Sequence, residues 1–304
     1  MVIIAVFPGQ GSQTPGFLAP WLTLDGAAER LAEYSEWAGV DLTAAGTEWD
    51  ADRIRDTQVA QPLIVAASLL SWGALEHRGL AGVAGHSVGE FAAAAAAGVL
   101  SEEDALRLVG IRGRAMAEAA AAEQTGMSAV IGGDEASIVA RLEELDLTPA
   151  NYNGGGQLVA AGSLPALQAL TAEPPAGTRV IPLQVAGAFH TRYMGSAVDA
   201  LRQAAATVES ADPAVTLWSN RDGASVTSGA DFVDLLVEQV ASPVRWDLCM
   251  ASFAAEGVTG ILELSPAGTL TGLAKRALRG VPGVAVKTPD DLPAAQALLS
   301  GAHA

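Results

Sequence analysis

The feature that most constrains the fold of this chain is a G-x-S-x-G pentapeptide between a strand-like and a helix-like segment. Residues 85–89 (Gly-His-Ser-Val-Gly) follow a short apolar segment and precede the alanine-rich, helix-forming residues 91–97. A strand that turns directly into a helix strains the serine, and a Cβ at either glycine would collide across the turn. The pattern predicts a nucleophile elbow, with the Ser87 hydroxyl exposed at a helix N-terminus whose N–H groups can stabilise an oxyanion.

Composition limits the class of protein. The chain has 304 residues, of which 50% are hydrophobic, so it can form one large domain or two. No uninterrupted apolar stretch approaches the roughly 18 residues of a bilayer-spanning helix, and residues 1–7 resemble a buried strand rather than a signal peptide. The single cysteine, Cys249, excludes an internal disulfide, and no Cys/His cluster suits a metal ion. We therefore expect a cytoplasmic protein that holds no metal and does not enter a membrane.

Charge excludes one class of partner. The net charge of −17 argues against nucleic acid, because phosphate backbones are bound by basic surfaces. No coiled-coil pattern or continuous apolar interface is evident, so we expect a monomer.

A second glycine-rich turn follows the first apolar segment. Residues 8–13 (Pro-Gly-Gln-Gly-Ser-Gln) invite a dinucleotide-binding interpretation, but the third glycine of that pattern is missing. The Lys-Ser/Thr pair of a phosphate-binding P-loop is missing too. We favour a turn that presents backbone N–H groups to some other anion.

One arginine lies on an apolar helix face. Residues 101–104 (Ser-Glu-Glu-Asp) form a capping signal for a helix that runs to about residue 122. On its helical wheel Arg112 lies at the centre of an apolar stripe made by Ala105, Leu108, Val109 and Met116. No acidic residue stands three or four positions away, although a buried guanidinium requires a partner. Two interpretations remain open: a structural arginine paired with a distant carboxylate, and an arginine that binds an anion.

The order of expected elements divides the chain into two parts. Residues 1–125 and 188–304 alternate strands and helices, which predicts a large α/β-hydrolase-like domain with a parallel sheet. Residues 126–187 predict a small inserted α+β subdomain of ferredoxin-like type, with a loop at 151–156. Helices are also expected over 26–45 and from residue 57, and strands over 215–218, 258–264 and 284–286.

The chain has four histidines, and one of them is the best candidate for a base that activates Ser87. His190 is expected to open a helical segment after Gly187-Ala188-Phe189. By itself, a histidine in such a place is more commonly a core residue with satisfied hydrogen bonds. His77 and His303 are expected to be inert.

Taken together, these motifs resemble a known family. Residues 8–13, Gln61-Pro62, residues 85–90, Arg112-Gly113, residues 187–190 and residues 242–246 (Ser-Pro-Val-Arg-Trp) occur in one order. That order resembles the malonyl-CoA:acyl carrier protein transacylases of fatty-acid synthesis and, similarly, the acyltransferase domains of polyketide synthases. The likeness spans essentially the whole chain, and the joint pattern is far more specific than the elbow alone.

The resemblance implies a ping-pong acyl transfer that uses no cofactor besides the substrate malonyl-CoA. Ser87, deprotonated by His190, would form a malonyl-serine ester and pass the acyl group to the phosphopantetheine thiol of holo acyl carrier protein. The backbone N–H groups of Gln10 and Val88 would hold the oxyanion. Arg112 would bind the free carboxylate of malonate, which supplies the partner missing from its helix.

The resemblance assigns further residues. The main-chain carbonyl of Gln239 would orient the histidine, so no triad aspartate is expected. The remaining pocket positions are Gln61, His86, Asn153 and Phe189. Phe189 matches the malonyl-selective variant, in which the ring fills the space of an α-methyl group. Glycines at 154–156 depart from the serine and proline that the family commonly carries there.

Carrier proteins are acidic, so an acidic enzyme needs a local basic patch to meet one. The candidates are Lys275, Arg276, Arg279 and Arg192, although a solvated helix face explains them equally well. Two other functions fit parts of the pattern. A G-x-S-x-G esterase or thioesterase predicts an acidic triad member and no role for Arg112, and a non-catalytic scaffold predicts a vestigial site.

Overall fold

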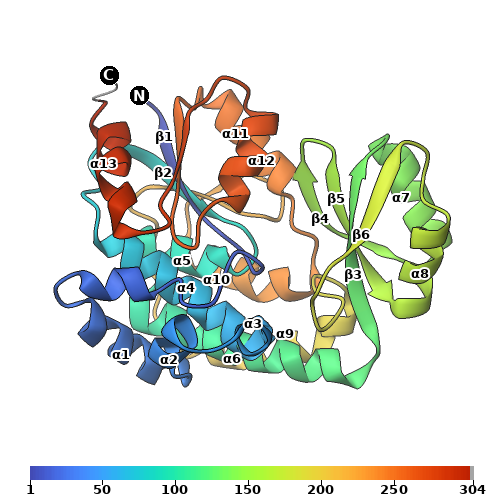
Figure 1. Ribbon diagram of the computed structural model, residues 1–304, viewed down its shortest axis with the longest axis horizontal. Coiled ribbons are helices and arrows are strands. Elements are labelled where there is room, and N and C mark those ends of the chain that lie inside the picture. The colour runs from blue at the N-terminus through green and yellow to red at the C-terminus, as the bar shows by residue number, and fades with distance from the viewer. Residues whose placement is uncertain (302–304) are drawn as a thin grey trace.

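The computed structural model describes residues 1–301 and contains two β-sheets that lie side by side (Figure 1). The larger sheet has the strand order β10-β9-β1-β2-β7-β8. Its strands are β1 (Ile3–Phe7), β2 (Leu80–Gly85), β7 (Thr216–Trp218), β8 (Ser225–Val226), β9 (Gly260–Glu263) and β10 (Gly283–Ala285). All neighbouring pairs are parallel except β7 and β8. The parallel sheet expected from the alternation of strands and helices is therefore present.

Strand β1 is buried on both faces, which explains its unbroken apolar sequence. Ile3, Ala5 and Phe7 face a core that includes α4 (Thr57–Gly73), α5 (Gly89–Ala96) and α6 (Glu102–Ala122). The intervening Ile4 and Val6 face a second core with α11 (Trp246–Ala255) and α12 (Thr269–Ala277). Helices on both faces fix this strand at the centre of the fold.

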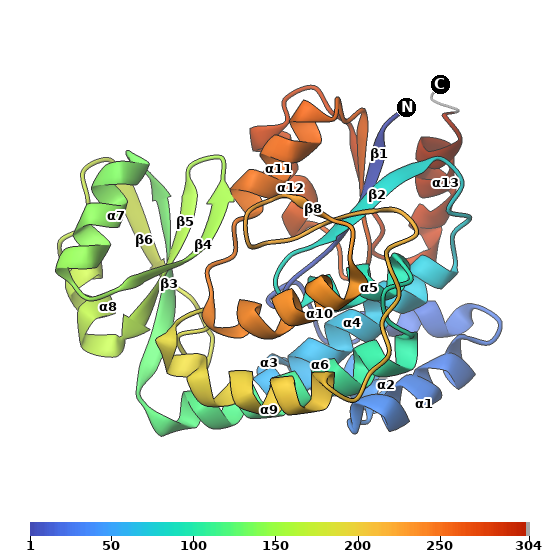
Figure 2. The ribbon, with the colours of Figure 1, turned by 180° about the vertical axis from the view of Figure 1, so that it is seen from behind.

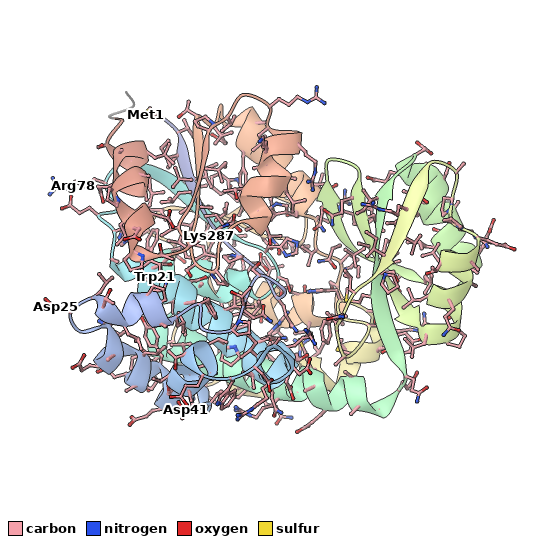
Figure 3. The ribbon with its side chains drawn as sticks, in the orientation of Figure 1. Met1, Trp21, Asp25, Asp41, Arg78 and Lys287 are labelled. Atoms are coloured by element: carbon pink, nitrogen blue, oxygen red, sulfur yellow. The ribbon has the colours of Figure 1, made fainter. Side chains whose placement is uncertain are left out.

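The other helices outside the smaller sheet surround these layers, as the view from behind shows (Figure 2). They are α1 (Ala27–Ala38), α2 (Leu42–Thr47), α3 (Ala51–Arg55), α9 (Gly195–Ala205), α10 (Gly229–Glu238) and α13 (Leu292–Ser300), with short 3₁₀ helices η1 (Ala19–Thr23), η2 (Arg192–Met194), η3 (Gln239–Ala241) and η4 (Pro289–Asp291). The Trp21 indole donates to the carbonyl oxygen of Lys287 at 3.1 Å and so links η1 to the C-terminal region (Figure 3).

Among residues 1–301, no helix combines the length and apolar character needed to span a bilayer.

The smaller sheet is antiparallel and has the order β4-β5-β3-β6. Its elements are β3 (Thr125–Gly132), α7 (Glu135–Glu144), β4 (Thr148–Gly154), β5 (Gln157–Ser163), α8 (Leu164–Ala172) and β6 (Thr178–Pro182). Val130, Leu158 and Ala160 of the sheet share a core with α7 and α8. This β-α-β-β-α-β sequence with the central pair β5-β3 is the ferredoxin-like arrangement expected from the sequence.

Three local expectations were wrong. Residues 151–154 belong to strand β4 rather than to a loop, and Gly155 and Gly156, both with positive φ, form the two-residue hairpin turn to β5. The helix expected over 26–45 is divided, because Gly39 adopts a left-handed conformation at the end of α1. His190 does not open a helix: it lies in a turn before η2 with φ of 61°. His303 lies outside the described residues.

Candidate active site

Ser87 lies in the turn between β2 and α5, with a left-handed φ of 52° that a serine rarely adopts. A Cβ at Gly85 would run into the backbone of Gly89, and a Cβ at Gly89 would meet the Phe7 carbonyl. Glycine at these two positions allows the elbow to close. The neighbouring His86 N–H donates to the Phe7 carbonyl at 2.9 Å, which ties the elbow to β1.

Asn220 braces the elbow from the neighbouring strand. It follows β7, which pairs with β2 in parallel, so the carboxyl ends of the two strands meet. The Asn220 side chain accepts from the Ser87 N–H at 2.7 Å and donates to the Gly85 carbonyl at 2.7 Å. The sequence motifs do not include this residue. Its only signal was a polar residue directly after a buried strand.

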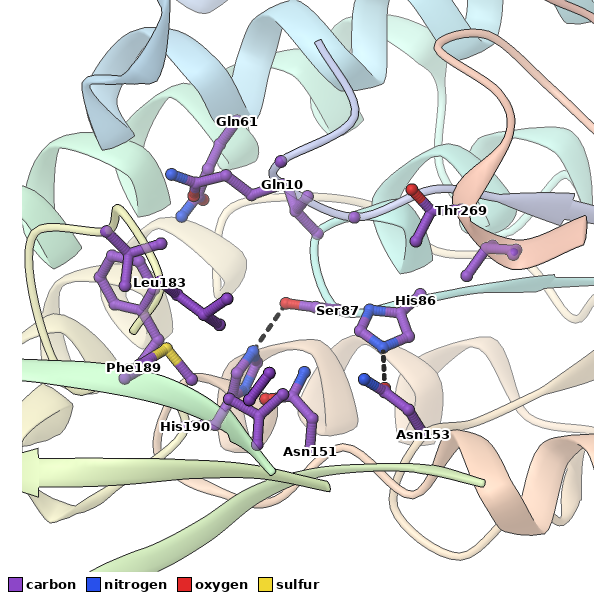
Figure 4. A pocket seen from close by; sticks show the side chains of 18 of the residues that line it. Gln10, Gln61, His86, Ser87, Asn151, Asn153, Leu183, Phe189, His190 and Thr269 are labelled. Carbon is purple, nitrogen blue, oxygen red and sulfur yellow. Dashed lines mark hydrogen bonds between the residues drawn. The ribbon is translucent and has the colours of Figure 1, made fainter. Parts of the chain in front are cut away.

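Ser87 and His190 form a hydrogen-bonded pair, with 2.7 Å between Oγ and Nε2 (Figure 4). His190 is buried, and its Nδ1 lies 2.8 Å from the carbonyl oxygen of Gln239. A carbonyl only accepts hydrogen bonds, so Nδ1 carries the proton and Nε2 presents its lone pair to Ser87. Burial, followed by the nearby Arg112 charge, lowers the pKa of His190 to about 3. The histidine is therefore a neutral base at physiological pH.

Arg112 is 1% exposed and lies beside Ser87. Its Nη1 donates to Gln61 Oε1 at 2.6 Å, its Nη2 donates to Gln239 Oε1 at 2.8 Å, and Nη2 is 3.5 Å from Ser87 Oγ. Across residues 1–301 no ion pair involves Arg112, and its buried Nε has no hydrogen-bond partner. Burial lowers the pKa of Arg112 to about 9, so the side chain remains a cation. Of the two interpretations left open, the geometry favours an arginine that binds an anion.

Two backbone N–H groups near Ser87 have no acceptor. In the described part of the chain, neither the Gln10 nor the Val88 N–H donates to a protein atom. Both residues line the same cavity as Ser87. The first turn lies directly against the elbow, since a Cβ at Gly9 would be 2.9 Å from His86 Nδ1. This arrangement leaves two free donors beside the serine hydroxyl.

The site opens into a cavity of about 240 Å³ between the larger and the smaller sheet. Its lining includes every predicted site residue except Gln239: Gln10, Gln61, His86, Ser87, Val88, Arg112, Asn153, Phe189 and His190. His86 Nε2 and Asn153 Oδ1 are 2.9 Å apart and join the elbow to β4 (Figure 4). Gln239 lies behind the cavity, where its side chain and its main chain hold Arg112 and His190. Within residues 1–301 no group of three or more His, Cys, Asp or Glu side chains suits a metal ion.

The predicted basic patch is present in part. Lys275, Arg276 and Arg279 are exposed on or just after α12, and none of them belongs to an ion pair in the described residues. Arg276 Nη2 donates to Gln157 Oε1 at 3.2 Å, and Gln157 lines the cavity. Arg192 does not join them as a free charge, because it pairs with Asp146 at 2.6 Å.

The chain is similar to known proteins over nearly its whole length. The family model described as "Acyl transferase domain" matches residues 4–291. The malonyl CoA-acyl carrier protein transacylase of Mycobacterium tuberculosis is 56% identical over 296 residues, covering 96% of this chain and 98% of the relative. The Escherichia coli protein of that name is 36% identical, covering 95% of this chain and 97% of the relative.

Solved structures match the chain over a similar length. A crystal structure of MCAT from Mycobacterium tuberculosis has a TM-score of 0.94 and 54% sequence identity, and covers 97% of this chain and 100% of that chain. A type II PKS acyl-carrier protein in complex with its malonyl-transacylase gives a TM-score of 0.91 at 32% identity, covering 97% and 99% of the two chains.

Proposed function

The chain belongs to the acyl transferase domain family, and from that premise we propose that it moves the malonyl group of malonyl-CoA to the phosphopantetheine thiol of an acyl carrier protein. The observation that carries the proposal is the position of Arg112. A buried cation with only neutral side chains as partners lies 3.5 Å from the nucleophile hydroxyl. Such a charge suits an acyl group that carries its own carboxylate.

In the first half-reaction Ser87 attacks the thioester carbonyl of malonyl-CoA. His190 Nε2 takes the hydroxyl proton as the Oγ–carbon bond forms, and the carbonyl oxygen becomes an oxyanion. The free N–H groups of Gln10 and Val88 stabilise that oxyanion, and one such donor lowers a barrier by about 3–4 kcal/mol. The carbon–sulfur bond then breaks, and the imidazolium returns the proton to the CoA thiolate.

In the second half-reaction the thiol of the carrier protein replaces CoA. His190 takes the thiol proton, and the sulfur attacks the malonyl-serine carbonyl. When the carbon–Oγ bond breaks, His190 returns the proton to Ser87, and malonyl-carrier protein leaves. The chemistry requires no cofactor beyond the CoA thioester.

The site also explains selection of the acyl group. A substrate without the distal carboxylate leaves the charge of Arg112 unpaired, and sites of this kind discriminate strongly. Phe189 is 6% exposed and lines the cavity, and we propose that its ring fills the space that an α-methyl group would need. Gln61 holds the guanidinium, and the His86–Asn153 pair holds β4 against the elbow.

We place the carrier protein over α12, whose residues Leu270 and Leu273 line the cavity. The unpaired cations Lys275, Arg276 and Arg279 supply the local positive charge that an acidic carrier requires from a protein with a net charge of −17. We assign residues 1–125 and 188–304 to a catalytic domain and 126–187 to a subdomain that closes the cavity. A cytoplasmic location, in which malonyl-CoA feeds fatty-acid or polyketide synthesis, fits this function.

The proposal is tested by intact-protein mass spectrometry after incubation with malonyl-CoA. We expect one malonyl adduct on the wild-type chain, none on Ser87→Ala, and loss of the adduct when holo acyl carrier protein is added, with the malonyl group found on the carrier. Release of the adduct as free malonate, with none on the carrier, would indicate a hydrolase instead.

A further inference from the structure

Glu90 is a buried carboxyl group that the proposed reaction does not use. It lies in the first turn of α5, three residues after Ser87, and is 1% exposed. Its Oε1 accepts from the Asn220 backbone N–H at 2.7 Å, and its Oε2 accepts from the Gln239 side-chain amide. Burial raises the pKa of Glu90 to about 8, although these N–H donors and the nearby Arg112 charge partly offset that rise. Burying a carboxyl group this close to Ser87 costs free energy of folding, so its presence needs an explanation.

Gln239 connects Glu90 to both halves of the site. Its side-chain NH₂ donates to Glu90 and to the Ser87 carbonyl at 3.0 Å. Its Oε1 accepts from Arg112 Nη2 at 2.8 Å, and its main-chain carbonyl accepts from His190 Nδ1 at 2.8 Å. One residue therefore holds the guanidinium with its side chain and the base with its backbone.

The orientation of the Gln239 amide depends on what faces its two ends. The guanidinium of Arg112 can only donate, so it requires the amide oxygen. The other end must then be NH₂, which requires acceptors, and Glu90 supplies one with the oxygen not used by Asn220. Glu90 and the Ser87 carbonyl thus both favour the one amide orientation that gives Arg112 an acceptor.

The same arrangement keeps the Glu90 carboxyl group apart from the Arg112 guanidinium. In residues 1–301 Arg112 and Glu90 form no direct ion pair, because the Gln239 amide lies between them. A direct pair would occupy the edge of the guanidinium that a substrate carboxylate needs. The intervening amide connects the two groups while leaving the cation free to bind a substrate carboxylate.

We propose that Glu90 is a positioning residue for acyl-group selection, which acts through the Gln239 side chain to hold Arg112 in place for the substrate carboxylate. The inference rests on the proposed malonyl transfer. It concerns the preference for malonyl over uncharged acyl groups, not the ability of Ser87 to react.

The test is the ratio of malonyl to acetyl loading on Ser87 in Glu90→Gln, measured by mass spectrometry with each CoA thioester. The new side chain keeps one oxygen for the fixed Asn220 N–H and turns its NH₂ toward Gln239. Two NH₂ groups cannot share this contact, so the Gln239 amide must shift or flip, and its hydrogen bond with Arg112 weakens or is lost. We expect the ratio to fall at least about tenfold, as when a hydrogen bond to a charged group is lost.

Two further variants separate this role from a structural one. Gln239→Met removes the amide but keeps the main-chain carbonyl for His190, so it should lower the ratio as much as Glu90→Gln. The double variant should be no worse than either single variant, because Glu90 acts only through Gln239. The matched control is Glu263→Gln, a fully buried carboxylate that caps α12 and should lower the unfolding temperature without changing the ratio.

The outcomes are distinct. A wild-type chain with no preference for malonyl would refute the proposed function itself. With that preference present, an unchanged ratio in Glu90→Gln, or effects of the two substitutions that multiply in the double variant, would overturn the role of Glu90. If Glu90→Gln does not fold, an unchanged ratio in Gln239→Met overturns it, and a lowered ratio supports it.

Discussion

His190 Nδ1 donates to the main-chain carbonyl of Gln239 at 2.8 Å, so a neutral oxygen stands where a serine protease places its triad carboxylate. The carbonyl fixes the tautomer and the ring orientation, as an aspartate would. It adds no negative charge. Because the proposed acyl group is itself an anion bound beside this histidine, a second carboxylate there would repel the substrate and compete for Arg112.

The buried histidine predicts an unusual pH profile for Ser87 malonylation. The neutral imidazole is the active base, and burial lowers its pKa to about 3, which extends the active form to lower pH. The malonylation rate at subsaturating malonyl-CoA should therefore be nearly constant between about pH 5 and pH 7. Quenched mass spectrometry measures this directly. A decline with a midpoint near the ordinary histidine value of about 6.5 would contradict it.

The elbow glycines predict a contrast in stability. Gly89→Ala places a Cβ against the Phe7 and Pro8 carbonyl oxygens, and such overpacking typically costs about 1–3 kcal/mol of unfolding free energy. Gly272→Ala, within α12, meets no atom within 4 Å and should stabilise the protein by about 0.5–1 kcal/mol. Urea unfolding of both variants checks the signs. Equal changes in unfolding free energy for the two variants would show that the elbow is not tightly packed.

Local sequence patterns predicted the elements that carry the site. The strand–turn–helix pattern around Ser87 identified the elbow, and the helical wheel identified Arg112 as buried. Both patterns depend on neighbours within a few residues. The acceptors of Arg112 could not be predicted this way, because Gln61 and Gln239 are 51 and 127 residues away in sequence.

The residues that sequence reasoning missed act only through the assembled fold. Asn220 reaches the elbow because β7 pairs with β2, and Glu90 matters because Gln239, the first residue of η3, lies against it. The turn at His190 has a positive φ that no local signal for histidine predicts. Strand β4 was mistaken for a loop because its Asn and Gly residues have low strand propensity, and pairing with β5 overrides that preference.

The cations of α12 predict a defect confined to the second half-reaction. Lys275→Glu with Arg276→Glu should raise the KM for holo carrier protein and weaken its salt dependence, because the encounter is electrostatic. Malonyl loading of Ser87 from malonyl-CoA should stay unchanged. The control is Arg202→Glu, an exposed charge reversal on α9. If it raises the carrier KM equally, net charge rather than the α12 surface governs docking.

The most direct test of the account compares malonyl-CoA and acetyl-CoA as acyl donors for Arg112→Ala and the wild-type chain. Loss of one member of a buried charge pair typically costs 2 kcal/mol or more, so malonyl loading of Ser87 should fall at least about 30-fold in the variant. Acetyl loading should fall far less or rise, which reverses or abolishes the preference for malonyl. A variant that folds and keeps the wild-type malonyl preference would contradict the claim that this buried cation selects the substrate.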